Sequence, residues 1–259
     1  MTKPPLHKAA QSVTAAQPGR GNAGRRKAGP AFLFDLDGTL VDSVYYHVLA
    51  WHEALDSGGI ELALWRIHRS VGMSGGLFVS ALLREIGLEL SPERVTRLHQ
   101  AHDDVYARLA PRVRVLPGAK ELLSYLTSVG VRWAIATSGM RQSAQPVLNF
   151  LEISQHVPVI TRDQVHRAKP DPDLFLAAAE RLDVPILESV VVGDSIWDLL
   201  AARRARALGV GLLSGGFGQS ELERAGAYRV YQDPADLLRH LDEVGVRTAS
   251  TPTGGSLEP

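Results

Sequence analysis

Two carboxylates one residue apart, Asp35 and Asp37, stand directly after the apolar run Ala31–Phe34. That run is long enough for a buried parallel strand, and Gly38 then lets the chain turn sharply. Carboxylates at the end of a buried strand are unfavourable unless a cation or another partner compensates them. Because ligands of open parallel sheets bind at the carboxyl ends of the strands, this turn is the first candidate site. The alternative interpretation is an ordinary acidic turn after a strand.

Polar residues recur farther along the chain, where later apolar runs end or where proline stiffens a loop. They are Thr137 and Ser138 after residues 131–136, Lys169 before Pro170, and Asp194 and Asp198 after residues 189–192. Carboxylate oxygens suit a hard cation such as Mg²⁺, which keeps several waters and is often bound to phosphates. Several acids with one lysine indicate phosphoryl chemistry, in which the protein supplies positioning and charge compensation. An aspartate can also be a covalent nucleophile toward phosphorus.

Each of these residues also has a purely structural interpretation. Thr137 and Ser138 suit a helix cap, Lys169 suits a solvated surface, and Asp194 and Asp198 suit a helix start and an exposed helix face. Their joint occurrence at predicted strand ends favours the functional interpretation.

The elements that must position these residues alternate between strands and helices. Strands are predicted at 31–34, 131–136, 157–161, 189–192, 209–213 and 227–231, and helices at 118–129, 141–150, 173–182, 196–207 and from Pro234 onward. This alternation predicts an α/β fold, a Rossmann-like parallel sheet with helices on both faces.

Residues 44–112 carry helical patterns only, at 44–57, 62–70, 77–86 and 91–109. The last of these begins with Ser-Pro-Glu, which is typical of a helix start because serine caps and proline suits the first turn. We therefore expect an all-helical cap at 44–112, inserted into an α/β catalytic core formed by residues 30–43 and 113–245.

The composition limits the remaining possibilities. The 259 residues are 45% hydrophobic and 22% charged, which is ordinary for a soluble enzyme of one large or two small domains. The formal net charge is zero, so nothing electrostatic indicates nucleic acid or an anionic membrane as a partner. The chain has no cysteine, which excludes disulfides, thiolate metal sites and cysteine nucleophiles. No apolar run approaches the roughly 20 residues of a membrane span. We expect a cytoplasmic protein and leave its oligomeric state open.

The two ends of the chain differ from the rest. Residues 1–29 are basic and free of acids, and residues 246–259 are rich in Thr, Ser, Gly and Pro. Neither segment has the apolar residues to form a core, so we expect both tails to be disordered. An Arg-rich leader can be a transit peptide, but the absence of a clear amphipathic stripe favours a solvated basic tail.

Four motifs resemble those of the haloacid dehalogenase superfamily, and they occur in that family's order. They are Asp35-Leu36-Asp37-Gly38-Thr39, Thr137 at the end of an apolar strand, Lys169-Pro170, and Gly193-Asp194-Ser195-Ile196-Trp197-Asp198. The resemblance is specific because four separate sites agree. A helical cap after the first motif is similar to the phosphoglycolate phosphatase and β-phosphoglucomutase branch.

The resemblance implies a covalent mechanism at the first motif. Asp35 would attack phosphorus to form an aspartyl-phosphate, while Asp37 would protonate the leaving oxygen and then activate water. Thr137 and the backbone amide of Ser138 would hold the phosphoryl oxygens. Lys169 would pair with Asp35 and the phosphate, which offsets two negative groups that must meet.

The resemblance also implies a Mg²⁺ site. Asp35, the main-chain carbonyl of Asp37, and Asp194 would bind the ion, and Asp198 would support them or act as a further, often water-mediated, ligand. The dehalogenase branch lacks an acid at the position of Asp37, so the presence of this acid implies phosphate rather than halide chemistry.

The expected function is therefore that of a magnesium-dependent phosphatase for a small phosphomonoester, phosphoglycolate-like or a sugar phosphate. A phosphosugar mutase is one alternative, since His47 stands where mutases often have a hinge histidine, although a helix residue packed under the cap is the simpler interpretation of His47. The turn at 73–77 has no basic residue to grip a second phosphate, and Arg69 before it is more simply a solvated side chain. The absence of lysine from 44–112 argues against phosphonate cleavage through a Schiff base. A binding or regulatory module without turnover is the other alternative.

Several cap residues have a second interpretation. His99 and His102, three apart and next to Asp103, could hold zinc, although a wet helix face explains them more simply. Three large side chains could line the underside of the cap, with core packing as the default interpretation: Trp51, Trp65 and Met73.

Overall fold

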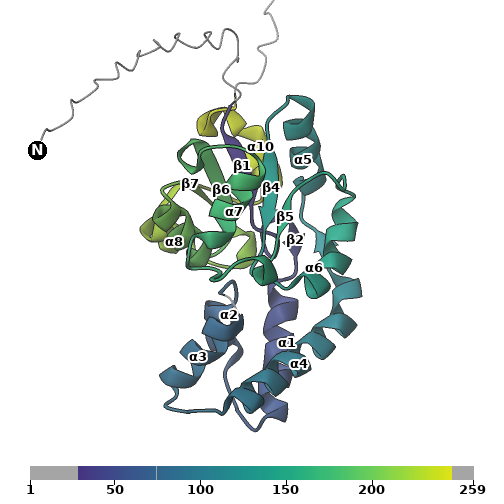
Figure 1. The fold of residues 1–259 in the computed structure, drawn as a ribbon, viewed down its shortest axis with the longest axis vertical. Coiled ribbons are helices and arrows are strands. Elements are labelled where there is room, and N and C mark those ends of the chain that lie inside the picture. The colour runs from purple at the N-terminus through teal and green to yellow at the C-terminus, as the bar shows by residue number, and fades with distance from the viewer. Residues whose placement is uncertain (1–28, 74, 247–259) are drawn as a thin grey trace, which may run out of the picture.

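The computed structural model describes residues 29–73 and 75–246 (Figure 1). Its centre is a six-stranded sheet in the order β5-β4-β1-β6-β7-β8, and every neighbouring pair is parallel. The strands are β1 (Ala31–Phe34), β4 (Trp133–Ala136), β5 (Val159–Ile160), β6 (Ser189–Gly193), β7 (Leu208–Leu212) and β8 (Ala227–Tyr231). Because all strands run the same way, their carboxyl ends meet at one edge, with β1 between β4 and β6. The predicted Rossmann-like parallel sheet is confirmed.

Successive side chains of β1 point to opposite faces of the sheet, as the pleat requires. Phe32 and Phe34 pack in one core with α5, α6 and α10, whereas Leu33 packs in the other with α7 and α8. The sheet is therefore buried on both faces, which explains its continuous apolar strands. The helices are α5 (Ala119–Ser128), α6 (Arg141–Leu148), α7 (Asp173–Arg181), α8 (Ile196–Ala205), α9 (Gln219–Ala225) and α10 (Pro234–Arg239).

Four helices pack on one another beside the sheet and lie below it in Figure 1. They are α1 (Val44–Ser57), α2 (Leu64–Ser70), α3 (Gly75–Glu85) and α4 (Pro92–Leu109). They share a separate apolar core around Trp51, Leu55 and Phe78. The Ser-Pro-Glu start is confirmed, since the Ser91 hydroxyl accepts a hydrogen bond from the Arg94 backbone at 3.4 Å.

A short antiparallel ribbon, β2 (Val41–Asp42) with β3 (Arg114–Val115), joins the two ends of this helical segment to the sheet. Neither β2 nor β3 was predicted, because two residues carry no periodicity, and α9 was also missed. The predicted cap boundaries, 44–112, stay a prediction. The predicted disorder of the tails mostly concerns residues outside the described ranges, but Val246, the first residue of the predicted C-terminal tail, is buried in the core on one face of the sheet.

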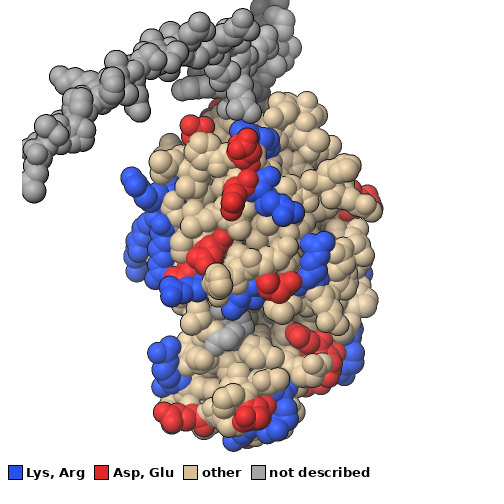
Figure 2. Space-filling model, in the orientation of Figure 1, with Lys and Arg blue, Asp and Glu red and all other residues tan. Residues whose placement is uncertain are grey.

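The visible face of the molecule mixes acidic and basic side chains (Figure 2). No helix in the described ranges combines the length and apolar character that crossing a membrane requires.

Candidate active site

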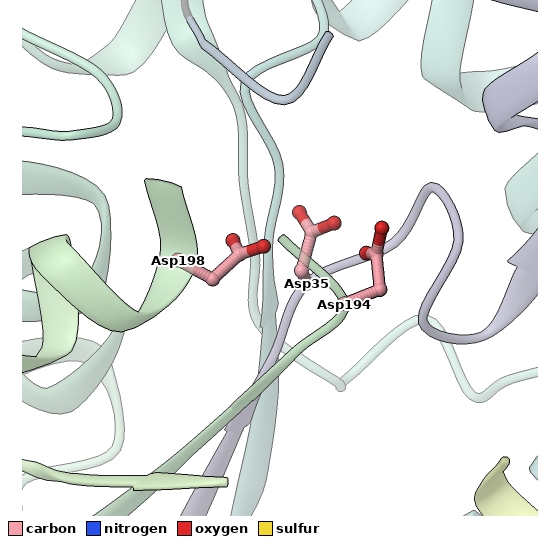
Figure 3. A group of neighbouring side chains, drawn as sticks. All are labelled: Asp35, Asp194 and Asp198. Atoms are coloured by element: carbon pink, nitrogen blue, oxygen red, sulfur yellow. The ribbon is translucent and has the colours of Figure 1, made fainter. Parts of the chain in front are cut away.

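Asp35, Asp194 and Asp198 form a buried acidic group (Figure 3). Each offers a carboxylate oxygen, and these oxygens all lie within 4.8 Å of one another. The sheet explains this convergence: Phe34 of β1 is in register with Val192 of β6, so the residues that follow leave the sheet side by side. Asp198 joins them from the first turn of α8.

Lys169 places its ammonium group among these acids. Nζ pairs with Asp35 Oδ1 and lies 2.8 Å from Asp198 Oδ1, and the side chain is only 1% exposed. The other oxygen of Asp198 accepts hydrogen bonds from the Ser195 backbone at 3.1 Å and the Ser195 hydroxyl at 2.6 Å. Burial alone would lower the pKa of Lys169, but Asp198 and Asp35 raise it overall, so the lysine stays cationic.

One ammonium group cannot neutralise three buried carboxylates. Burial raises the pKa of Asp35 to about 7 against the attraction of Lys169, and the charges of Asp198 and Asp37 add to the rise. The pKa of Asp194 is raised well above its ordinary value by burial and by its acidic neighbours. Excess negative charge on hard oxygen donors is the environment that Mg²⁺ prefers, so these residues fit that ion.

Backbone closes tightly around Asp194. A Cβ at Gly38 would lie 2.4 Å from Asp194 Oδ2, and one at Gly215 would lie 1.8 Å from it, so neither position has room for a side chain. Gly38 also has φ +82°, a left-handed conformation that favours glycine. The Thr39 hydroxyl donates to Asp194 Oδ1 at 2.8 Å and completes the support.

The Asp37 carboxylate is not a member of this acidic group. Its Oδ1 accepts a hydrogen bond from the Ser43 hydroxyl at 2.6 Å and lies 3.3 Å from His47 Nε2, while its Oδ2 accepts from the Thr137 hydroxyl at 3.4 Å. Burial would raise the pKa of Asp37, but His47 and the hydrogen bonds lower it overall. Two acids separated by one residue therefore sit in opposite electrostatic environments.

A chain of hydrogen-bonding groups runs from Asp37 into the helical segment. His47 Nδ1 lies 3.2 Å from His102 Nε2, and His102 Nδ1 lies 3.0 Å from Asp103 Oδ1. Burial lowers the pKa of His102 to about 4, so it is neutral at pH 7. The sequence alone does not predict this chain, because His47 and His102 are 55 residues apart.

A cavity of about 470 Å³ opens over these groups and is lined by both the sheet loops and the helices α1 to α4. Asp35, Asp37, Thr137, Ser138 and Asp194 all line it. Thr137 Oγ1 accepts from the Gly139 backbone at 3.0 Å, and the Ser138 hydroxyl donates to the Gly72 carbonyl at 3.1 Å. Every predicted site residue thus lines the cavity except Lys169 and Asp198, which are buried and joined to Asp35 by the ion pairs of Lys169.

The other candidates divide. Trp51 and Met73 line the cavity, whereas Trp65 is 62% exposed. Within residues 29–73 and 75–246, His99 and His102 belong to no group that could hold a metal ion. Arg69 forms an ion pair with Glu221 and does not line the cavity.

The fold and the site together define a Rossmann-like α/β enzyme with a buried acidic centre at the carboxyl edge of its sheet. A model of the haloacid dehalogenase-like hydrolase family matches residues 30–206, and the chain belongs to this family.

Named relatives agree with this assignment. A hydrolase of known structure from Pseudomonas syringae is 54% identical with a TM-score of 0.82, covering 84% of this chain and 100% of that one. A plasmid phosphoglycolate phosphatase from Cupriavidus necator is 34% identical over 182 residues, 68% of this chain and 77% of the relative. A β-phosphoglucomutase from Bacillus subtilis is 29% identical over 218 residues, 82% of this chain and 92% of the relative. The family that the four motifs predicted is confirmed.

Proposed function

We propose that this chain hydrolyses a small phosphorylated metabolite with the help of Mg²⁺, through an aspartyl-phosphate at Asp35. The chain is a phosphoric monoester hydrolase of the haloacid dehalogenase-like family. The observation that carries the proposal is the convergence of the Asp35, Asp194 and Asp198 carboxylates, with the Lys169 ammonium group paired to Asp35 and Asp198.

Asp35 acts as the nucleophile. Asp35 directly follows β1, and its carboxylate lines the cavity and is paired with Lys169. The carboxylate would therefore face a bound substrate while its charge is partly offset. Its attack on phosphorus releases the alcohol and leaves the phosphoryl group on the carboxylate oxygen. Asp35, Asp194 and the main-chain carbonyl of Asp37 would hold Mg²⁺, which when bound supplies positive charge to the phosphoryl oxygens. Asp198 fixes the position of Lys169.

Asp37 acts as the general acid and base. It protonates the departing oxygen and then removes a proton from the water that hydrolyses the aspartyl-phosphate. Ser43 and His47 hold one of its oxygens and Thr137 the other. Thr137 and the backbone amide of Ser138 bind the phosphoryl oxygens.

Hydrolysis is better supported than transfer within a phosphosugar. A mutase must hold a second phosphate. Arg162 is the arginine among the residues that line the cavity, and its Nη1 donates to the Val165 carbonyl at 2.9 Å. Arg69 is the arginine nearest in sequence to the turn between α2 and α3. Its guanidinium group is engaged with Glu221 and stands 4.4 Å from the ring centroid of Phe217. We infer that the helices α1 to α4 act as a cap that closes the cavity and excludes water, as lids commonly do.

The test is phosphate release from a panel of phosphomonoesters with Mg²⁺ and with EDTA. Wild-type protein should release phosphate only with Mg²⁺, and Asp35→Asn should release none, because an amide cannot act as the nucleophile. Asp242→Asn, a change of an exposed acid far along the chain, is the matched control and should retain full activity. Full activity of Asp35→Asn would refute the proposed nucleophile.

A further inference from the structure

The loop at 213–217, between β7 and α9, packs against the Asp194 carboxylate. Gly215 packs so closely on Asp194 that a Cβ there would lie 1.8 Å from Oδ2. The Ser214 hydroxyl donates to the Gly38 carbonyl at 2.5 Å, and Gly38 packs on the same carboxylate. The position of this loop therefore sets the space in which the Asp194 carboxylate can lie.

The opposite side of the loop contacts α2 through His68. His68 Nε2 donates to the Gly215 carbonyl at 2.8 Å, and the residue is only 8% exposed. Its ring stacks on the Tyr45 ring with centroids 5.2 Å apart, and the centroid of the Phe217 ring lies 5.5 Å from that of His68. The ring is thus held in one orientation, and its N–H is directed at the residue whose backbone touches Asp194.

We infer that His68 is a positioning residue for the Mg²⁺ site, acting on Asp194 through Gly215. The inference rests on the proposed function, because it concerns the ion assigned there to Asp35 and Asp194. Without the His68 donor, the buried Gly215 carbonyl loses its partner, and such a group is unfavourable enough to make the loop move. Residues that orient metal ligands from behind typically contribute about 10–100-fold to metal affinity. Docking of α2 on the loop is therefore coupled to affinity for the ion.

The experiment measures Mg²⁺ affinity of the full chain without substrate, by competition with Mn²⁺ followed by electron paramagnetic resonance. His68→Phe keeps an aromatic ring between Tyr45 and Phe217 but removes the donor, and it should weaken binding about 10-fold or more. His68→Gln restores an N–H donor and should recover part of the loss. His52→Ala is the matched control, since His52 is a partly exposed α1 residue paired with Asp56, and it should bind as wild type does.

A change at the other end of the contact gives an independent check. Gly215→Ala places a methyl group against Asp194 and should weaken Mg²⁺ binding. Adding His68→Phe to this variant should weaken Mg²⁺ binding little further, because both substitutions act on the Asp194 carboxylate. Near-ultraviolet circular dichroism establishes that each variant is folded.

Wild-type affinity in folded His68→Phe would overturn the inference and leave the proposed function standing. An equal loss in His52→Ala would also overturn it, since the effect would then be a general one of the helical segment. Failure of the wild type to bind Mg²⁺ would overturn the proposed metal site and this inference together.

Discussion

The metal-free protein should lose stability as the pH rises, and Asp35→Asn should remove a large part of that loss. Burial raises the pKa of Asp35 from 3.8 to about 7, against the attraction of Lys169. A carboxyl group whose pKa is higher in the folded than in the unfolded state holds its proton more firmly when folded. Its destabilising effect is therefore absent below pH 4 and grows as the pH rises toward 7.

The size of the effect follows from the shift. A rise from 3.8 to about 7 is about 3 units, and at 1.36 kcal/mol per unit this is about 4 kcal/mol of lost stability. At about 2–4 °C per kcal/mol, the midpoint of thermal unfolding should fall on the order of 10 °C more in wild type than in Asp35→Asn between pH 4 and pH 8. Asparagine nearly matches aspartate in size, and Lys169 keeps Asp198 as a partner at 2.8 Å.

The assay is thermal unfolding in EDTA, followed by circular dichroism across this pH range. Asp242→Asn serves as the control and should follow the wild-type curve, because this acid is exposed. Added Mg²⁺ should stabilise the wild type more at pH 8 than at pH 5, where the carboxyls hold protons. Wild-type and Asp35→Asn curves that run parallel with pH in EDTA would refute the reasoning.

Three further changes test other contacts. His102→Ala should lower kcat about 10-fold with little change in KM, because His102 acts on Asp37 through His47. In the double variant with His47→Ala, the His102→Ala change should cause no further loss, and additive losses would contradict this route. Asp198→Asn should lower kcat about 10–100-fold in a phosphate-release assay, because Lys169 loses the charged partner that it has besides Asp35. An unchanged kcat would show that Asp198 is dispensable. Arg69→Gln should leave phosphate release within about threefold of wild type and change the unfolding free energy by at most about 1 kcal/mol, since its ion pair is partly exposed; abolished turnover would instead indicate a direct role in binding substrate.

Much of the fold was predictable because its main strands are continuous apolar runs and its main helices are long enough to show a helical spacing of apolar residues. Predicted boundaries of the main strands and helices lie within two residues of those observed. The ribbon of β2 and β3 was not predictable, since it depends on pairing Val41 with Val115 across the whole helical segment. The helix α9 was missed because it is seven residues long and follows a glycine-rich loop.

The candidate site divides in the same way. Asp35, Thr137 and Asp194 could be found from sequence because each follows an apolar strand, and parallel strands bring their ends together. The contact from His68 to Gly215 could not be found, because 147 residues separate them and a histidine in a helix has many possible partners. Residues that support a site from behind are set by tertiary packing and leave no local pattern.

The central claim is that Asp35 carries the phosphoryl group, and rapid acid quench of the working enzyme tests it most directly. Protein mixed with Mg²⁺ and a hydrolysed ester, quenched and cleaved into peptides, should show the mass of one added phosphoryl group on the peptide that contains Asp35. Asp35→Asn should show none. A phosphoryl group on another residue would contradict this claim. So would a variant at Asp37 that turns over substrate slowly but shows no phosphoryl adduct at any quench time.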